Sequence, residues 1–292
     1  MSDHSSLPPL PALSAGTLLR ALFKRPGRPP ATRPLATRYL LSGLDAGHVA
    51  RYRAALGFGG GHVPLTYCYL LAQRAHLATM LDAAFPFRLV GAIHVDNLLR
   101  AGVQPVAGRP LVLTTTVAIA PPAANGAVHA SLETKATQDG GLVFACRSTY
   151  LVVRGQRGGG PRPASAPAPD LATIAGWQLP AAGGRAYAAL SGDWNPIHLW
   201  PWSARLMGLQ APIIHGMHTL GRACAALERA GGRPLVRLDG RFRAPVPLGS
   251  TVALAAALAQ GRYTVSVGQR IAVEGEFDFD AAQVMRDAYS RS

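Results

Sequence analysis

The hydrophobic pattern of this chain runs twice through the same order, a buried helix followed by several strands. Residues Tyr67 to Leu81 are apolar over most of a helical circumference and contain no Gly or Pro, which predicts a buried helix. Gly, Pro, Asn and Asp then separate four strand-like runs at hairpin spacing. These runs cover residues 89–98, 110–120, 127–136 and 142–153. A buried helix followed by antiparallel strands predicts an α+β unit in which a sheet wraps a helix.

The second half of the chain repeats this order. Apolar residues recur at helical spacing from Met217 to about Glu228. Val236, Leu238 and Phe242 then fall at even spacing among polar residues, the period of a half-exposed strand. The expected strands cover residues 235–244, 250–257, 262–269 and 271–279.

The two halves align, but they are not equal in content. Pro64-Leu-Thr-Tyr67 matches Pro212-Ile-Ile-His215 at an offset of 148 residues, which predicts that both long helices start at the same point of each half. Upstream of this match the first half lacks about thirteen residues, which in the second half include Asp193 and His198. We therefore expect one site per chain, with the first half as its structural partner.

Composition suggests four segments. Residues 1–35 form a basic, Pro-rich arm, and residues 36–154 form the first unit. Residues 155–175 change to Gly, Pro, Ala and Ser, the composition of a linker, and residues 176–292 form the second unit.

The candidate chemistry lies in the stretch from Tyr187 to His198. Asp193 and His198 flank the corner Asn195-Pro196, so two proton-handling groups share one short loop, and we interpret them as an acid/base pair. Further on, Gly216 falls at a predicted helix start, where free N–H groups and the helix dipole can hold developing negative charge.

Other roles for these residues stay open. Asp193 or Asn195 could be the N-cap of a helix that begins at Pro196. His215 and His218 could join Asp193 and His198 in a metal site, although the spacing fits no standard zinc pattern, so we expect no metal. Ser191 lacks the Gly-x-Ser-x-Gly context of a nucleophile. His48, near Asp45, is interpreted as part of a solvated helix start.

The stretch resembles the signature of the MaoC-like (R)-specific enoyl-thioester hydratases, the hydratase 2 family. Seven positions agree in order, namely Ser191, Gly192, Asp193, Asn195, Pro196, Ile197 and His198, and a His-Gly-Met turn follows at 215–217. The segment 85–97 is also similar to the family's N-terminal half. The resemblance implies a double hot-dog fold, two antiparallel sheets each wrapping a long helix, in which a degenerate first hot dog accompanies a catalytic second one.

The resemblance also implies the roles of the site residues. Asp193 and His198 would be the acid/base pair, and the Gly216 amide would be the oxyanion donor. Asn195 and Ser191 would orient the loop. His215 and Met217 are candidate substrate contacts.

The implied activity is the reversible hydration of trans-2-enoyl thioesters to (3R)-3-hydroxyacyl thioesters in fatty-acid metabolism, a hydro-lyase reaction without cofactor. The substrate would be carried on coenzyme A or on an acyl carrier protein, and hot-dog units usually pair, so we expect a homodimer. The alternative is a hot-dog module that binds acyl thioesters without turnover.

Charge and cysteine content change this picture little. The net charge of +14 invites a nucleic-acid partner, but the arginines are spread along the chain without a nucleic-acid motif, so we expect none. The same charge suits an anionic carrier. The three cysteines lie far apart, and neither a membrane span nor a secretory signal is evident, so we expect a protein of the reducing cytoplasm.

Overall fold

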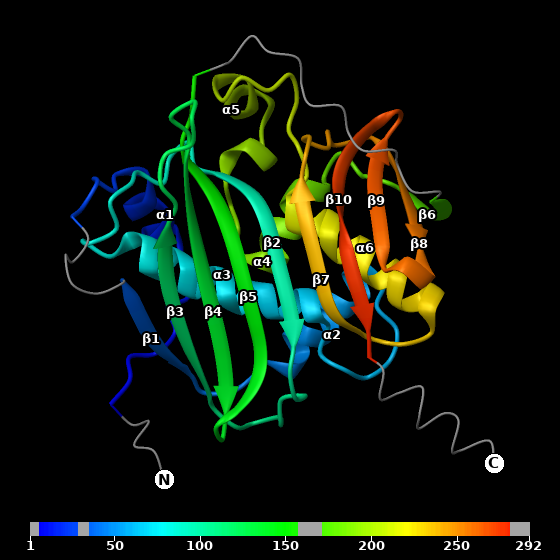
Figure 1. Ribbon diagram of the computed structural model, residues 1–292, viewed down its shortest axis with the longest axis horizontal. Coiled ribbons are helices and arrows are strands. Elements are labelled where there is room, and N and C mark those ends of the chain that lie inside the picture. The colour runs from blue at the N-terminus through cyan, green and yellow to red at the C-terminus, as the bar shows by residue number, and fades with distance from the viewer. Residues whose placement is uncertain (1–5, 29–34, 157–170, 281–292) are drawn as a thin grey trace. The chain divides into compact units, whose positions relative to one another are not determined.

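The computed structural model of the chain describes residues 6–28, 35–156 and 171–280, which belong to two compact units interleaved along the sequence (Figure 1). The continuous domain boundaries expected from composition stay a prediction. The first unit comprises Met1–Asp45, Cys68–Asn97 and Gly102–Ala168, and the second comprises Ala46–Tyr67, Leu98–Ala101 and Pro169–Ser292.

The first unit is a sheet with one long helix, α3 (Leu65–Leu81), on one face (Figure 1). Across this sheet the strands lie in the order β1-β3-β4-β5-β2, and the first four pair with their neighbours antiparallel. The core forms where Met80 of α3 meets Val117 of β3 and Leu132 of β4. The strands are β1 (Ala36–Leu41), β2 (Ile93–Ala101), β3 (Leu111–Ile119), β4 (Val128–Gln138) and β5 (Gly141–Val153), and a short helix, α1 (Ala15–Leu22), precedes them.

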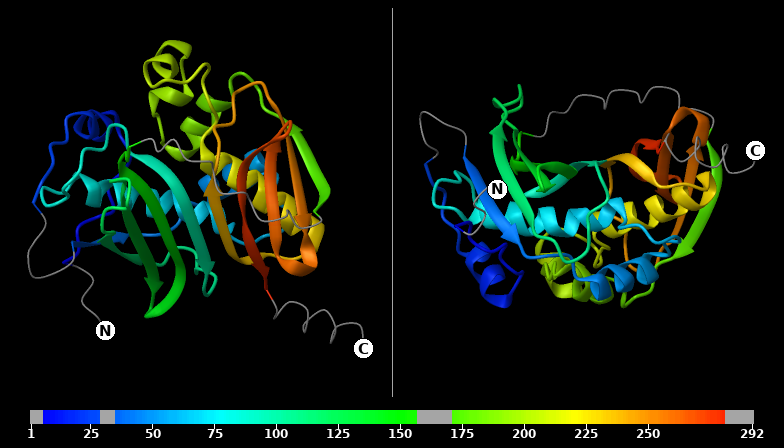
Figure 2. Two further views of the ribbon diagram at one scale, coloured as in Figure 1. Left: turned by 45° about the horizontal axis from the view of Figure 1, so that its top comes forward. Right: turned by 90° about the horizontal axis from the view of Figure 1, so that it is seen from below.

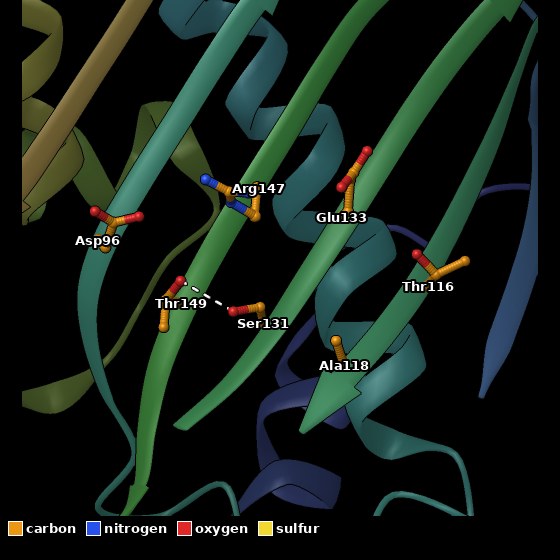
Figure 3. A pocket seen from close by; sticks show the side chains of 7 residues that line it. All are labelled: Asp96, Thr116, Ala118, Ser131, Glu133, Arg147 and Thr149. Carbon is orange, nitrogen blue, oxygen red and sulfur yellow. Dashed lines mark hydrogen bonds between the residues drawn. The ribbon is translucent and has the colours of Figure 1, made fainter. Parts of the chain in front are cut away.

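The opposite face of this sheet is polar. Ser131 and Glu133 alternate with the core residue Leu132, so they point away from α3. With neighbours on β2, β3 and β5 they line an open hollow of about 360 Å³ (Figure 3). None of the predicted site residues lines this hollow.

The second unit repeats the arrangement with helix α6 (Gly216–Gly231) along one face of its strands (Figure 2). Its strands pair antiparallel in the order β7-β10-β9-β8-β6. Helix and sheet approach closely at Gly240 of β7, where an added Cβ would lie 2.9 Å from Leu220 Cδ1 of α6. The strands are β6 (Ala172–Gln178), β7 (Leu235–Phe242), β8 (Thr251–Ala257), β9 (Arg262–Val267) and β10 (Arg270–Phe279).

Short helices complete the second unit and carry its loops. They are α2 (Ala46–Leu56), α4 (Gly183–Ser191), the 3₁₀ turn η1 (Pro196–His198), α5 (Pro201–Leu206) and the 3₁₀ turn η2 (Leu258–Gln260). Each unit thus pairs a long helix with five strands, the α+β hot-dog arrangement that the sequence predicts.

Two local expectations are wrong. The segment expected as linker up to residue 175 already contains the start of β6, which pairs with β8 from Ala172↔Ala256 onward, because pairing with β8 overrides its Ala-rich composition. The offset of 148 residues predicts that the first long helix starts 148 residues before Gly216, the start of α6. Helix α3 begins three residues earlier than that, at Leu65. Most of the linker, residues 157–170, lies outside the described residues.

No helix in the described part of the chain is long and apolar enough to cross a membrane.

We predict that Leu254→Ala lowers the free energy of unfolding by about 2–5 kcal/mol, because Leu254 of β8 is 0% exposed and its removal leaves a cavity. The matched control is Leu206→Ala in the same unit, where the leucine is 79% exposed. Urea unfolding followed by circular dichroism measures both. Equal midpoints for the two variants would contradict the assigned core.

Candidate active site

The loop that carries Asp193 is shaped by the end of α4. Gly192 ends this helix in the left-handed region at φ 77°, which glycine adopts at little cost, and turns the chain away from the helix axis. Ser191 Oγ donates to the Tyr187 carbonyl at 2.8 Å and accepts the Asp193 N–H at 3.2 Å. Ser191 thus links the last turn of α4 to the start of the loop, and its orienting role in the site stays a prediction.

Asn195 is the N-cap of η1. Its Oδ1 accepts the Ile197 N–H at 3.4 Å, while its own N–H donates to Asp193 Oδ1 at 3.2 Å. The capping role left open by the sequence is thus the observed one for Asn195, whose side chain is exposed. Its contribution is to fix the corner between the two acid/base candidates.

His198 ends η1 and is 7% exposed. Its Nδ1 lies 2.9 Å from the Ile213 carbonyl oxygen, which can only accept, so Nδ1 carries the hydrogen and Nε2 keeps a lone pair. Behind it, Gly184 of α4 leaves room for the backbone, since a Cβ there would lie 1.9 Å from the His198 carbonyl oxygen. The Ile213 carbonyl therefore sets the tautomer of this imidazole, and Gly184 permits the position of its backbone.

His215 joins the two parts of the site. It is 3% exposed and stacks on His198, with ring centroids 3.6 Å apart and planes at 28°. Its Nε2 donates to the Asp193 carbonyl oxygen at 2.8 Å. The sequence suggested a substrate contact for His215, whereas these contacts are to the loop itself, and contact with substrate stays a prediction.

One carboxylate oxygen of Asp193 and one ring nitrogen each of His198 and His215 lie within 4.8 Å of one another. Two heavy atoms at that separation can both hydrogen-bond one water, since each such bond spans about 2.8 Å. The structure thus brings together the acid/base candidates that the sequence placed on one loop.

Burial keeps the imidazoles of this site neutral. It lowers the pKa of His198 to about 4, with His215 adding to the effect and Asp193 opposing it. Burial also lowers the pKa of His215, and it lowers that of His218 to about 3 with a contribution from Arg222. The pKa of Tyr187, whose ring centroid lies 5.0 Å from that of His215, is raised by burial and by Asp193.

Helix α6 points its N-terminus into this region. His215 is its N-cap, and no side chain caps its first turn. The N–H groups of His218 and Thr219 donate to the His215 carbonyl, which leaves the Gly216 amide as the candidate donor to an acceptor. Gly216 also fits closely, since a Cβ there would lie 2.7 Å from Phe242 Cε1. Met217 is 4% exposed and belongs to the core of the unit, and its contact with substrate stays a prediction.

The geometry also bears on the metal alternative. Asp193, His198 and His215 each offer one ligand atom close enough to the other two to hold an ion, so the absence of a metal stays a prediction.

Sequence reasoning missed three contributions. Gly184 lies just before the motif and makes room for the backbone of His198. Tyr187 packs beside His215, and its place as the first residue of the motif is the signal that points to it. His48 was interpreted as solvated, but its Nε2 lies 2.7 Å from the Leu190 carbonyl oxygen at the end of α4, a contact across 142 residues that no local pattern reveals.

A long helix packed on an antiparallel sheet is the arrangement of a hot-dog protein, and here a loop with Asp193 and His198 lies beside the N-terminus of α6. Residues 170–277 match the MaoC like domain model. The chain is 32% identical over 232 residues to 3-hydroxyacyl-thioester dehydratase X of Mycobacterium tuberculosis, covering 77% of this chain and 80% of that protein. This chain therefore belongs to the MaoC-like dehydratase family.

Two further comparisons agree. A crystal structure of HtdX from Mycobacterium tuberculosis superposes with a TM-score of 0.66 at 26% identity, covering 83% of this chain and all of that one. Enoyl-CoA hydratase 2, peroxisomal, of Arabidopsis thaliana is 42% identical over 67 residues, 22% of each chain.

The neutral imidazoles predict how stability depends on pH. The pKa of His198 is about 4 in the folded protein and near the ordinary 6.5 when unfolded, so between these values the unfolded chain binds more protons. The free energy of unfolding should therefore fall as pH drops from 6.5 toward 4, and His198→Gln should weaken that dependence.

The control is His129→Gln on β4, which should keep the wild-type slope. Urea unfolding at pH 7.5, 5.5 and 4.5 measures it. An unchanged slope in His198→Gln would show that this ring is not held neutral.

Proposed function

We propose that the protein catalyses the reversible hydration of trans-2-enoyl thioesters to (3R)-3-hydroxyacyl thioesters in fatty-acid metabolism. The observation that carries the proposal is the convergence of Asp193 and His198 within 4.8 Å, beside the uncapped N-terminus of α6. Family membership supports the reaction class, a hydro-lyase acting on acyl thioesters.

The hydrogen-bonding state of the two groups suits activation of water. His198 Nε2 carries a lone pair because Nδ1 faces the Ile213 carbonyl, and a carboxylate at Asp193 is also an acceptor. One water can donate a hydrogen to each, which leaves its oxygen lone pairs free to attack C3 of the enoyl group. One of the two residues takes the proton and the pair delivers it to C2, so the elements of water are added across the double bond.

Charge on the thioester oxygen grows as C3 is attacked. The Gly216 amide, at the positive end of the α6 dipole, is the proposed donor to that oxygen. Because the charge is greatest in the transition state, this interaction raises the rate more than it raises substrate affinity. A substituent on Gly216 would push against Phe242, which explains the need for glycine here.

The acyl carrier is either coenzyme A or an acyl carrier protein, and the basic charge of the chain suits both anionic partners. A homodimer and a cytoplasmic location remain predictions from the sequence.

We predict that Asp193→Asn and His198→Ala each lower kcat by about 10²-fold to 10⁴-fold, because each removes an acceptor for the attacking water. The assay follows loss of enoyl absorbance with trans-2-enoyl-CoA substrates of several lengths, with chiral analysis of the product. Asp278→Asn on β10, whose side chain is 60% exposed, is the matched control and should keep wild-type kcat.

Wild-type turnover in either site variant would overturn the assignment of these residues. If the wild-type protein binds acyl-CoA in calorimetry but does not hydrate it, the chain is a binding module instead.

We predict that prolonged treatment with EDTA leaves kcat unchanged, because Asp193 and His198 by themselves supply the proton transfers of the proposed reaction. The rate is measured before and after chelation, with zinc added back as a control. Loss of activity that zinc restores would establish a metal-dependent reaction.

A further inference from the structure

We propose that His48 is a positioning residue for the proposed hydration, holding the end of α4 so that Asp193 keeps its place. His48 lies on the first turn of α2, in the half of the chain that carries no acid/base pair, yet it belongs to the same compact unit as Asp193. The expected effects on kcat rest on the proposed function, whereas the expected effects on hydrogen exchange rest on hydrogen bonding alone.

The first contact is to a carbonyl at the end of α4. The last four carbonyls of a helix have no acceptor role within it, and Leu190 lies next to the last residue of α4. His48 Nε2 lies 2.7 Å from that carbonyl oxygen and, since a carbonyl only accepts, Nε2 is the donor. His48 therefore caps the C-terminus of α4 from a different element, three residues before Asp193.

The second contact fixes the imidazole. The other ring nitrogen, Nδ1, lies 3.2 Å from the Tyr67 hydroxyl, which can donate to it. The two rings meet edge to face at 5.4 Å between centroids, and Tyr67 is 2% exposed. Tyr52, fully buried, packs edge to face on Tyr67 at the same separation, so a buried aromatic pair holds the histidine in one orientation.

The Leu190 carbonyl lies only a few covalent bonds from the loop that carries Asp193. Ser191 follows Leu190 directly and accepts the Asp193 N–H, so a shift of the Leu190 carbonyl moves the group that orients Asp193. A catalytic carboxylate displaced by about 1 Å can cost up to a hundredfold in rate. The degenerate half of the chain thus contributes to the site through His48 rather than through a second acid/base pair.

The test compares full-length variants that differ in one donor. In His48→Phe the ring remains but the donor to Leu190 is lost, and kcat should fall roughly tenfold with KM changed less than about threefold. His48→Gln keeps an N–H donor at a similar reach and should recover kcat to within about threefold of wild type. Tyr67→Phe removes only the hydroxyl and should fall between them, while His129→Phe on β4 is the control and should match wild type.

Hydrogen exchange gives a readout that does not need turnover. Amides of residues 188–198 should exchange faster in His48→Phe than in wild type and return toward wild type in His48→Gln, while those of β9 stay unchanged. If the wild-type protein fails to hydrate any enoyl thioester, the proposed function fails, but this comparison still decides the role of His48.

Two results would overturn the proposal. One is wild-type kcat and exchange in His48→Phe. The other is an equal loss of kcat in His48→Phe and His48→Gln, which would show that the hydrogen-bond donor is not what matters.

Discussion

The site depends on one buried imidazole, His215, which contacts both halves of the catalytic loop. Its ring lies flat on His198 while its Nε2 holds the Asp193 carbonyl, so the two acid/base candidates cannot move independently. Burying polar groups costs free energy that hydrogen bonds offset, and a backbone carbonyl supplies a partner for one nitrogen of each ring. Because those carbonyls only accept, they also determine which nitrogen of each ring keeps a lone pair.

His215 is also the N-cap of α6, so one residue contacts both acid/base candidates and begins the helix whose N-terminus faces them. In the proposed reaction, the groups that activate water and the amide that receives oxyanion charge must keep a fixed separation. Placing both around one N-cap residue achieves this without a long chain of intervening contacts. The glycines at 184 and 216 serve the same purpose, because a side chain at either would displace a neighbour of the site.

The interleaving of the two units gives the degenerate half a part in this arrangement. The segment Ala46–Tyr67 precedes the first long helix in sequence but belongs to the unit that holds the site. The first half of the sequence has no counterpart of the Asp193–His198 loop, yet part of it belongs to the unit that holds this loop. The polar side chains of that part, His48 and Tyr67, are engaged with the end of α4 and with each other.

The local features of this protein follow from its amino-acid sequence alone. Hydrophobic periodicity located both long helices and nearly all strands, and the short stretch from Ser191 to His198 placed Asp193 and His198 together, since their proximity is fixed by the few bonds between them. Three features arise only in the folded chain: His215 stacks on His198, His48 bonds to the end of α4, and Ala172 pairs as the start of a strand. These contacts join residues far apart in sequence, and packing, not local propensity, selects such partners.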